Sequence, residues 1–366
     1  MKSALCEMFG IETPIFAFSH CRDVVVEVSR AGGMGVLGMG RMSPERLKEE
    51  LTWIDAHIDG KPYGIDIVMP STFEPLRGEL PQEQVAFVRD LLDKAGIPRL
   101  PQQDEAQIKH TLLKELSFTP QDSQLMLDVA MEHPIKLIVN ALGSPDRALV
   151  ERAHARGIKV AAMAGAAKHA IRHKALGCDF VIAVGHEAGG HTGDTTSMVL
   201  WPRIVDAVAP LPVLGAGGVG RGRQMAAALA LGCEGVWCGS VWLTTAQSEV
   251  SPDIKARLIE AGPNDSVHTR TVTGKPCRTL RNRFSDAWDA PDAPPVLSSP
   301  AQIQLWWGEG RTRVERARAR EFLTYPVGQL VGDMNAETSV RQVMQDMLGE
   351  LVEAKQRLDD LLDDAS

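Results

Sequence analysis

Residues 180–193 have the sequence FVIAVGHEAGGHTG, a short apolar run followed by a loop of glycines and histidines. Five apolar residues end at Gly185, and a loop with two histidines, one glutamate and further glycines follows. A buried strand that ends at a loop of small residues is where an α/β barrel places its chemistry. The paired glycines Gly189 and Gly190 would let a flat ligand lie against bare backbone. We therefore take His191, which follows them, as the candidate catalytic residue.

The same alternation of a short apolar strand and a helix runs through most of the chain. Strands are expected at 14–19, 35–39, 63–69, 136–141, 160–163, 180–184, 212–214 and 235–238. Helices are expected at 45–57, 168–176, 202–208 and 223–231, among others. Such alternation indicates a parallel sheet with crossover helices, and eight units in about 240 residues is the size of a (β/α)8 TIM barrel. The barrel would span residues 8–250, and residues 251–366 would form a helical extension that packs on it.

Two segments depart from this alternation. Residues 71–135 contain several prolines and are too long for an ordinary connection. Helical pieces are expected there at 82–95, 104–116 and 120–132. The segment is either an excursion over the top of the barrel or a plain helical insertion. Residues 311–320 carry five arginines, which form either a solvated helix face or an anion-binding patch.

Composition narrows the class of protein. The chain has 366 residues, of which 44% are hydrophobic and 23% charged, as in ordinary globular proteins. A net charge of −8 argues against a nucleic-acid surface, which is normally basic. Six scattered cysteines without a CxxC pair indicate reduced thiols. No apolar run is long enough to span a membrane, so we expect a cytoplasmic protein that binds neither nucleic acid nor membrane.

A glycine-rich segment, GAGGVG at 215–220, directly follows the seventh expected strand. It matches GxGxxG, and a Rossmann interpretation with Glu234 at the ribose is available. We set it aside because that fingerprint belongs to the first strand–helix turn, whereas six units precede it here. In a barrel, the loops after strands seven and eight hold a phosphate through backbone N–H groups, and Gly239 with Ser240 would supply the second loop. The alternative is that these glycines only form tight turns.

The loop that follows the apolar run at 180–184 contains two histidines, for which we expect different roles. His186 and His191 are separated by five positions, with two glycines between them, so they would not share a helix face as in the zinc motif HExxH. We expect no metal. A histidine at a strand end, beside a phosphate-anchored ligand, suits proton transfer near neutral pH. His191 has glycines close on both sides and is the more accessible, whereas His186 is expected to be structural.

Several segments resemble the nitronate monooxygenase (2-nitropropane dioxygenase) family, which is similar to the flavin-dependent enoyl-acyl carrier protein reductases of bacteria. They are EAGGHTG at 187–193, AAMAGAAKHA at 161–170, PVLGAGGVGRGRQMAAALALG at 212–232 and CGS at 238–240. PIFAFS and AGGMGVLG match the first two strands of that family, and TGKPCRTLRN at 273–282 is similar to a stretch after its barrel. The resemblance covers about residues 8–285.

The resemblance implies a TIM barrel that binds FMN non-covalently, with the redox chemistry supplied by the flavin. His191 falls on the family's catalytic histidine, which removes a proton from a nitroalkane or positions a nitronate. The implied cofactor contacts lie at strand ends and in the loops that follow. They are Ala17, Phe18, Ser19, Asp66, Met163, Gly189, Gly190, Ala216, Gly217, Gly218, Gly239 and Ser240.

Three positions depart from the family pattern. Asp66 stands where an asparagine is usual, and its charge would disfavour a reduced, anionic flavin unless the carboxyl is protonated. Met163 stands where a lysine is frequent, and Asn140 where one subgroup has a histidine. Met163 and the residues after it resemble instead members that act on acyl-CoA thioesters.

The sequence thus predicts an FMN-dependent oxidoreductase that oxidises alkyl nitronates with O2 to a carbonyl compound and nitrite. The closest alternative is an FMN-dependent enoyl or acyl-CoA oxidoreductase on the same barrel, with NAD(P)H as redox partner. A non-redox barrel that binds a phosphorylated metabolite and a catalytically silent flavin-binding regulator are further alternatives. A homodimer is compatible with the sequence.

Overall fold

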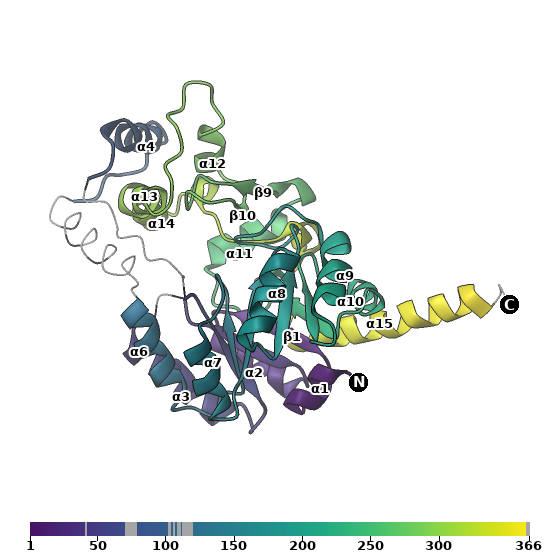
Figure 1. Ribbon diagram of the computed structural model, residues 1–366. Coiled ribbons are helices and arrows are strands. Elements are labelled where there is room, and N and C mark those ends of the chain that lie inside the picture. The colour runs from purple at the N-terminus through teal and green to yellow at the C-terminus, as the bar shows by residue number, and fades with distance from the viewer. Residues whose placement is uncertain are drawn as a thin grey trace.

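Eight parallel strands close into one barrel in the order β1 to β8 (Figure 1). The computed structural model describes residues 1–40, 42–69, 79–101, 104, 107, 111 and 120–363. The strands are β1 (Ile15–Ser19), β2 (Met34–Gly38), β3 (Tyr63–Ile67), β4 (Leu137–Asn140), β5 (Lys159–Ala164), β6 (Phe180–Val184), β7 (Val213–Ala216) and β8 (Gly235–Cys238). The predicted TIM barrel and all eight predicted strands are confirmed, and the Rossmann interpretation of the glycine-rich segment is excluded.

Helices surround the barrel on its outer side (Figure 1). They are α2 (Arg22–Arg30), α3 (Pro44–His57), α6 (Pro120–Ala130), α7 (Arg147–His154), α8 (Ala167–Leu176), α9 (Ser197–Val208) and α10 (Gly222–Ala230), while α1 (Ala4–Phe9) covers the amino end. Their ends follow local chemistry. Ser43 accepts a hydrogen bond from Arg46 N at the start of α3, and Gly177 ends α8 with φ +94°.

The amino end of the barrel is closed by aromatic rings. Phe9, at the end of α1, lies 5.7 Å from the ring of Phe16 and 6.0 Å from the ring of Phe180, measured between centroids. All three side chains are buried. Since this end is filled, a ligand has to enter at the carboxyl ends of the strands, which is where barrels of this kind place their sites.

The C-terminal segment contains a two-stranded sheet that the sequence did not predict. Its elements are α11 (Pro252–Glu260), β9 (Ser266–Thr269), β10 (Cys277–Leu280), α12 (Arg283–Ala287), α13 (Ala301–Leu305), the π-helical turn η3 (Trp306–Arg311), α14 (Thr312–Ala317) and α15 (Val340–Asp363). β9 and β10 pair antiparallel. The first half of α15 packs on α10 and α2, and its second half projects from the body (Figure 1).

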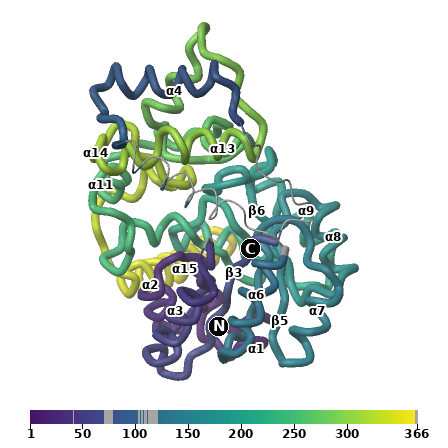
Figure 2. Tube along the Cα trace, turned by 90° about the vertical axis from the view of Figure 1, so that its left-hand side faces the viewer, coloured from purple at the N-terminus to yellow at the C-terminus, as the bar shows by residue number. Residues whose placement is uncertain are grey.

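The predicted helix at 82–95 is present as α4 (Gln82–Lys94), beside α13 and η3 (Figure 2). Val88 and Leu92 pack with Leu305 and Trp306 in one apolar cluster. The insertion therefore joins the C-terminal segment. The predicted piece at 120–132 corresponds to α6, which packs on α3 as a barrel helix, and most of the piece at 104–116 lies outside the described residues.

The five arginines of 311–320 each form an ion pair with a carboxylate. The pairs are Arg311–Glu315, Arg313–Asp93, Arg316–Asp104, Arg318–Asp253 and Arg320–Glu260. Asp93 and Asp104 both belong to the insertion, so two of these pairs connect it with the C-terminal segment. Because every one of these positive charges faces a carboxylate, the contacts favour an ion-paired helix surface over an anion-binding patch.

The helix expected at 202–208 begins five residues earlier than predicted. α9 starts at Ser197 and contains Pro202 in its interior. The start is fixed from within the preceding loop, because the Glu187 carboxylate accepts hydrogen bonds from Ser197 N at 3.0 Å and from Ser197 Oγ at 2.9 Å. A carboxylate at a helix N-terminus also interacts favourably with the helix dipole.

All six cysteines are buried and unpaired, as their spacing indicated. No helix in the described part of the chain has the length and apolar character needed to cross a membrane.

Candidate active site at the carboxyl ends of the strands

The loop after β6 is held by the β9–β10 hairpin. Gly190 and Arg278 exchange two backbone hydrogen bonds, of 2.9 and 2.7 Å. Gly189 lies so close to the segment after η4 (Arg320–Phe322) that a Cβ atom would sit 2.8 Å from the carbonyl carbon of Val327. This packing already accounts for glycine at position 189. At Gly190, where φ is +82°, nothing lies within 4 Å of the Cβ position, so this glycine borders open space.

His191 is exposed, and one hydrogen bond orients its ring. Its Nδ1 lies 2.8 Å from the carbonyl oxygen of Pro276, at the start of the second hairpin strand. A carbonyl oxygen can only accept, so Nδ1 carries a proton and Nε2 presents a lone pair when the ring is neutral. The ring can therefore take a proton at Nε2 and return it from the same atom.

Arg278 of the hairpin also contacts the loop after β6, and its side chain is buried, with 3% exposed. Its Nε donates to the carbonyl oxygen of His186 at 3.1 Å, and its Nη1 donates to that of Ser266 at 3.0 Å. Its Nη2 lies 2.8 Å from His186 Nε2, while His186 Nδ1 lies 2.9 Å from the carbonyl oxygen of Gly193. Both ring nitrogens of His186 are thus engaged, which fits the structural role expected for it.

Three side chains near Arg278 could in principle ligate a metal. Donor atoms of His186, Asp194 and His268 all lie within 4.8 Å of one another. However, both nitrogens of His186 are already hydrogen-bonded, and the guanidinium of Arg278 would repel a cation. Burial, together with the neighbouring His186 and Arg278, lowers the pKa of His268. The cluster is therefore better suited to hold the loop than to hold a metal.

The loops after β7 and β8 lie side by side, because Ala216 and Trp237 are register partners. Gly217 and Gly218 have φ of +104° and +73°, and a Cβ at Gly217 would lie 3.0 Å from both Gly185 O and Ser197 Oγ. In the described part of the chain, the N–H groups of Gly217, Gly218 and Gly239 donate to no protein acceptor. Free backbone N–H groups on adjacent loops form a cradle for a phosphate group.

The end of β1 contributes an aromatic wall. The ring of Phe18 stacks on Trp237 at 6.1 Å and meets His20 edge-on at 5.1 Å, measured between centroids. His20 is oriented through its Nδ1, 2.7 Å from Gly38 O. Ala17 packs among the residues between the strands and the helices, so only its backbone can face a ligand. Ser19 Oγ accepts a hydrogen bond from Cys21 N at 3.1 Å.

The remaining predicted contacts occupy β3, β5, β7 and the β8 loop. Asp66 is 4% exposed, and its Oδ2 has no hydrogen-bond partner among the described residues. Burial raises the pKa of this carboxyl well above its ordinary value. Met163 and Ala216 belong to the apolar cluster inside the barrel. Ser240 Oγ accepts a hydrogen bond from Gly328 N at 2.9 Å and so ties the β8 loop to the C-terminal segment.

The model of the nitronate monooxygenase family matches residues 2–350. The chain is 46% identical to a putative monooxygenase, Rv1533, of Mycobacterium tuberculosis, over 99% of this chain and 100% of that protein. Its fold is similar to that of a nitroalkane oxidase from Streptomyces ansochromogenes, with a TM-score of 0.76, 26% identity, and coverage of 97% and 100%. It is also similar to a FabK mutant from Thermotoga maritima, with a TM-score of 0.73, 25% identity, and coverage of 99% and 100%.

The chain belongs to the nitronate monooxygenase family. Membership makes the protein an oxidoreductase. The resemblance carried by the glycine loops and the EAGGHTG segment is therefore confirmed. Three residues near the candidate site were not predicted from the sequence. Pro276 and Arg278 belong to the hairpin outside the barrel, and His20 lies in the short turn after β1.

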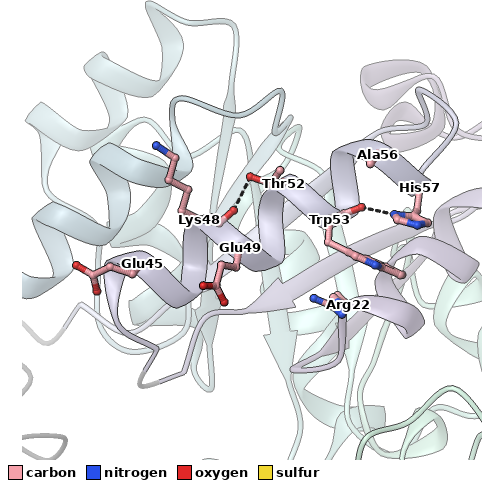
Figure 3. Close-up of a pocket in the computed structure, with 8 residues that line it drawn as sticks. All are labelled: Arg22, Glu45, Lys48, Glu49, Thr52, Trp53, Ala56 and His57. Carbon is pink, nitrogen blue, oxygen red and sulfur yellow. Dashed lines mark hydrogen bonds between the residues drawn. The ribbon is translucent and has the colours of Figure 1, made fainter.

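A hollow of about 610 Å³ on the outer face of α3 is separate from the candidate active site (Figure 3). Trp53 stacks on His57 there with 4.0 Å between ring centroids, and the Arg22 guanidinium lies 4.4 Å from the Trp53 ring centroid. Its remaining lining residues are polar or charged side chains and one alanine of the same helix face. It lies on a helix surface rather than at a strand end, so we do not assign it to the candidate active site.

The buried carboxyl of Asp66 gives a prediction for stability. The unfolded chain releases this proton above about pH 4, whereas the folded protein keeps it, so the folded state binds more protons. Stability from this group is complete below that pH and is lost as pH rises toward the raised pKa of the folded state. Relative to wild type, the free energy of unfolding of Asp66→Asn should increase as the pH rises from about 5 toward that raised pKa, with a limiting slope of about 1.4 kcal/mol per pH unit.

Urea unfolding of the two cofactor-free proteins from pH 5 to pH 7 measures this difference. Other titrating groups are common to both proteins and cancel. Parallel curves would show that the carboxyl is ionised in the folded protein.

Proposed function

We propose that the protein is an FMN-dependent oxidoreductase that oxidises alkyl nitronates with O2 to a carbonyl compound and nitrite. One observation carries the proposal: an oriented histidine on the β6 loop stands at the same barrel mouth as two adjacent glycine loops with free N–H groups. FMN would supply the electron transfer between substrate and O2. The family match and the fold similarity to a nitroalkane oxidase support the same class.

The chain's residues fit the phosphate of FMN. The N–H groups of Gly217, Gly218 and Gly239 would donate to its oxygens, and the glycines leave room that a side chain would fill. Phe18 and Ser19 at the end of β1, with Asp66 and Met163 inside the barrel, would border the ring system. Gly190 leaves open space beside the reactive histidine.

His191 would carry the proton transfer. With Nδ1 donating to Pro276 O, Nε2 would accept a proton from the carbon that bears the nitro group of a nitroalkane. The same hydrogen bond would stabilise the imidazolium that forms, because the acceptor is a fixed carbonyl dipole. Once protonated at Nε2, the ring would donate to a nitronate oxygen and so position the anion.

A second candidate is an FMN-dependent enoyl or acyl-CoA oxidoreductase with NAD(P)H as redox partner. The apolar Met163 inside the barrel favours it, as does the fold similarity to FabK. Both candidates use the same cradle and the same histidine. They differ in the molecule that reduces the flavin.

Anaerobic stopped-flow mixing of the purified protein separates them. We expect the visible flavin absorption to bleach rapidly with an alkyl nitronate and slowly with NADPH or NADH, and we expect nitrite to form once O2 is admitted. Rapid bleaching by NADPH or an acyl-CoA, with none by the nitronate, would establish the second candidate instead. If the protein purifies colourless and binds no added FMN, both candidates are excluded, and a non-redox barrel that binds a phosphorylated metabolite becomes the better interpretation.

A further inference from the structure

Asp66 is a carboxyl group inside the barrel. Along β3 the side chains of Tyr63, Ile65 and Ile67 pack against the surrounding helices. Since successive residues of a strand point to opposite faces, Asp66 points to the interior. It is the fourth of the five strand residues, so it lies near the carboxyl end, where the site is.

The barrel interior around Asp66 is apolar and offers few hydrogen-bond partners for its carboxyl group. Its register partners on the two neighbouring strands are Gly38 and Val139. Val139 is fully buried in the apolar interior cluster. Burial alone accounts for the raised pKa, and Oδ2 has no hydrogen-bond partner within the described chain. A buried polar atom without a partner is costly, so its retention at a ligand site points to a partner on the ligand.

Gly38, the register partner of Asp66 on β2, leaves space that the rings of Phe18 and His20 fill. A Cβ atom there would lie 2.7 Å from the ring of Phe18 and 2.8 Å from Nδ1 of His20. The aromatic wall of the mouth is therefore packed directly against the strand next to Asp66. A planar ligand that lies on this wall would therefore border the strand that pairs with β3 at Asp66.

We propose that Asp66, as a neutral carboxylic acid, binds the pyrimidine edge of the FMN ring system. This inference rests on the proposed function, because it requires FMN at the barrel mouth. A protonated carboxyl offers an O–H donor and a carbonyl acceptor side by side. The pyrimidine edge of the ring offers a carbonyl and an adjacent N–H, which is the complementary pair. An ionised carboxylate would offer acceptors only and would repel the electron density that the ring gains on reduction.

An asparagine reproduces this donor and acceptor pair, and a leucine of similar size removes it. Cofactor-free wild type, Asp66→Asn and Asp66→Leu are therefore titrated with FMN at pH 7, with quenching of flavin fluorescence as the signal. Asp66→Asn should bind FMN within about 3-fold of wild type, and Asp66→Leu about 10-fold or more weakly, since a lost buried hydrogen-bond pair exceeds 1 kcal/mol.

The protonation state is measured without any cofactor. The infrared difference between cofactor-free wild type and Asp66→Asn at pH 7 should contain the carbonyl band of a protonated carboxylic acid. Asp253→Asn is the control, because the hydrogen bond from Arg318 holds the pKa of Asp253 below its ordinary value, so its difference spectrum should contain carboxylate bands.

Carboxylate bands for Asp66, or equal FMN affinity of wild type and a folded Asp66→Leu, would overturn the inference. If Asp66→Leu does not fold, the infrared spectrum decides. Failure of wild type itself to bind FMN contradicts the proposed function instead, so the two failures are distinguishable.

Discussion

Replacing Gly217 with glutamate should give a folded protein that has lost FMN. Gly217 has φ of +104°, and its Cβ position lies 3.0 Å from both Gly185 O and Ser197 Oγ, so any side chain is strained there. A glutamate would also place a negative charge against the phosphate and block the N–H groups that hold it. We expect FMN affinity to fall by at least 10²-fold, because both attraction and space are lost at once.

Two matched variants separate the effects of backbone strain and of the added charge on FMN binding. Gly217→Ala imposes the same backbone strain without the charge, so it should retain more FMN than Gly217→Glu. Gly157→Glu adds the same charge at another left-handed glycine, with φ of +69° and nothing within 4 Å of its Cβ position, just before β5. It should bind FMN like wild type. The measurements are flavin content after purification and a fluorescence titration. If the Gly217→Glu protein still purifies yellow, the phosphate of FMN does not bind at this loop.

The barrel could be predicted because its signals are local. Each strand is a short apolar run that ends at glycine or a polar residue, and eight such runs alternate with helices. Counting the strands before GAGGVG could assign this segment to the loop after the seventh barrel strand rather than to a Rossmann turn. The closed barrel confirms that placement in the fold.

The parts that were missed depend on contacts between distant segments. His191 is oriented by Pro276, 85 residues away, and the His186 backbone is held by Arg278, 92 residues away. Neither partner is marked by a local pattern, although both lie in TGKPCRTLRN, a segment whose family resemblance could have directed attention to it. The early start of α9 was missed for a different reason: Glu187, ten residues earlier in the same β6–α9 loop, caps it, and no standard capping motif has that spacing. The raised pKa of Asp66 follows from burial, which no sequence pattern states.

Replacing His191 with alanine should leave FMN bound and lower turnover of a nitroalkane by about 10²-fold or more, which is the usual contribution of a general acid or base. The side chain is exposed, and its hydrogen bond to Pro276 O lies outside the phosphate cradle, so the fold and the cofactor should persist. His169→Ala is the control, because this exposed histidine lies on the outer helix α8. Wild-type turnover in His191→Ala would exclude the residue from the mechanism.

The substrate used with His191→Ala separates its two proposed tasks. A neutral nitroalkane must lose a proton from carbon before it can be oxidised, whereas a nitronate prepared in base has already lost it. If Nε2 removes that proton, the variant should lose turnover of the nitroalkane far more than turnover of the nitronate. If the ring only positions the anion, both rates should fall together, because the missing hydrogen bond to the nitronate oxygen is common to both. If His191→Ala oxidises the nitronate at the wild-type rate and loses turnover only of the nitroalkane, His191 is the base that generates the nitronate at this barrel mouth.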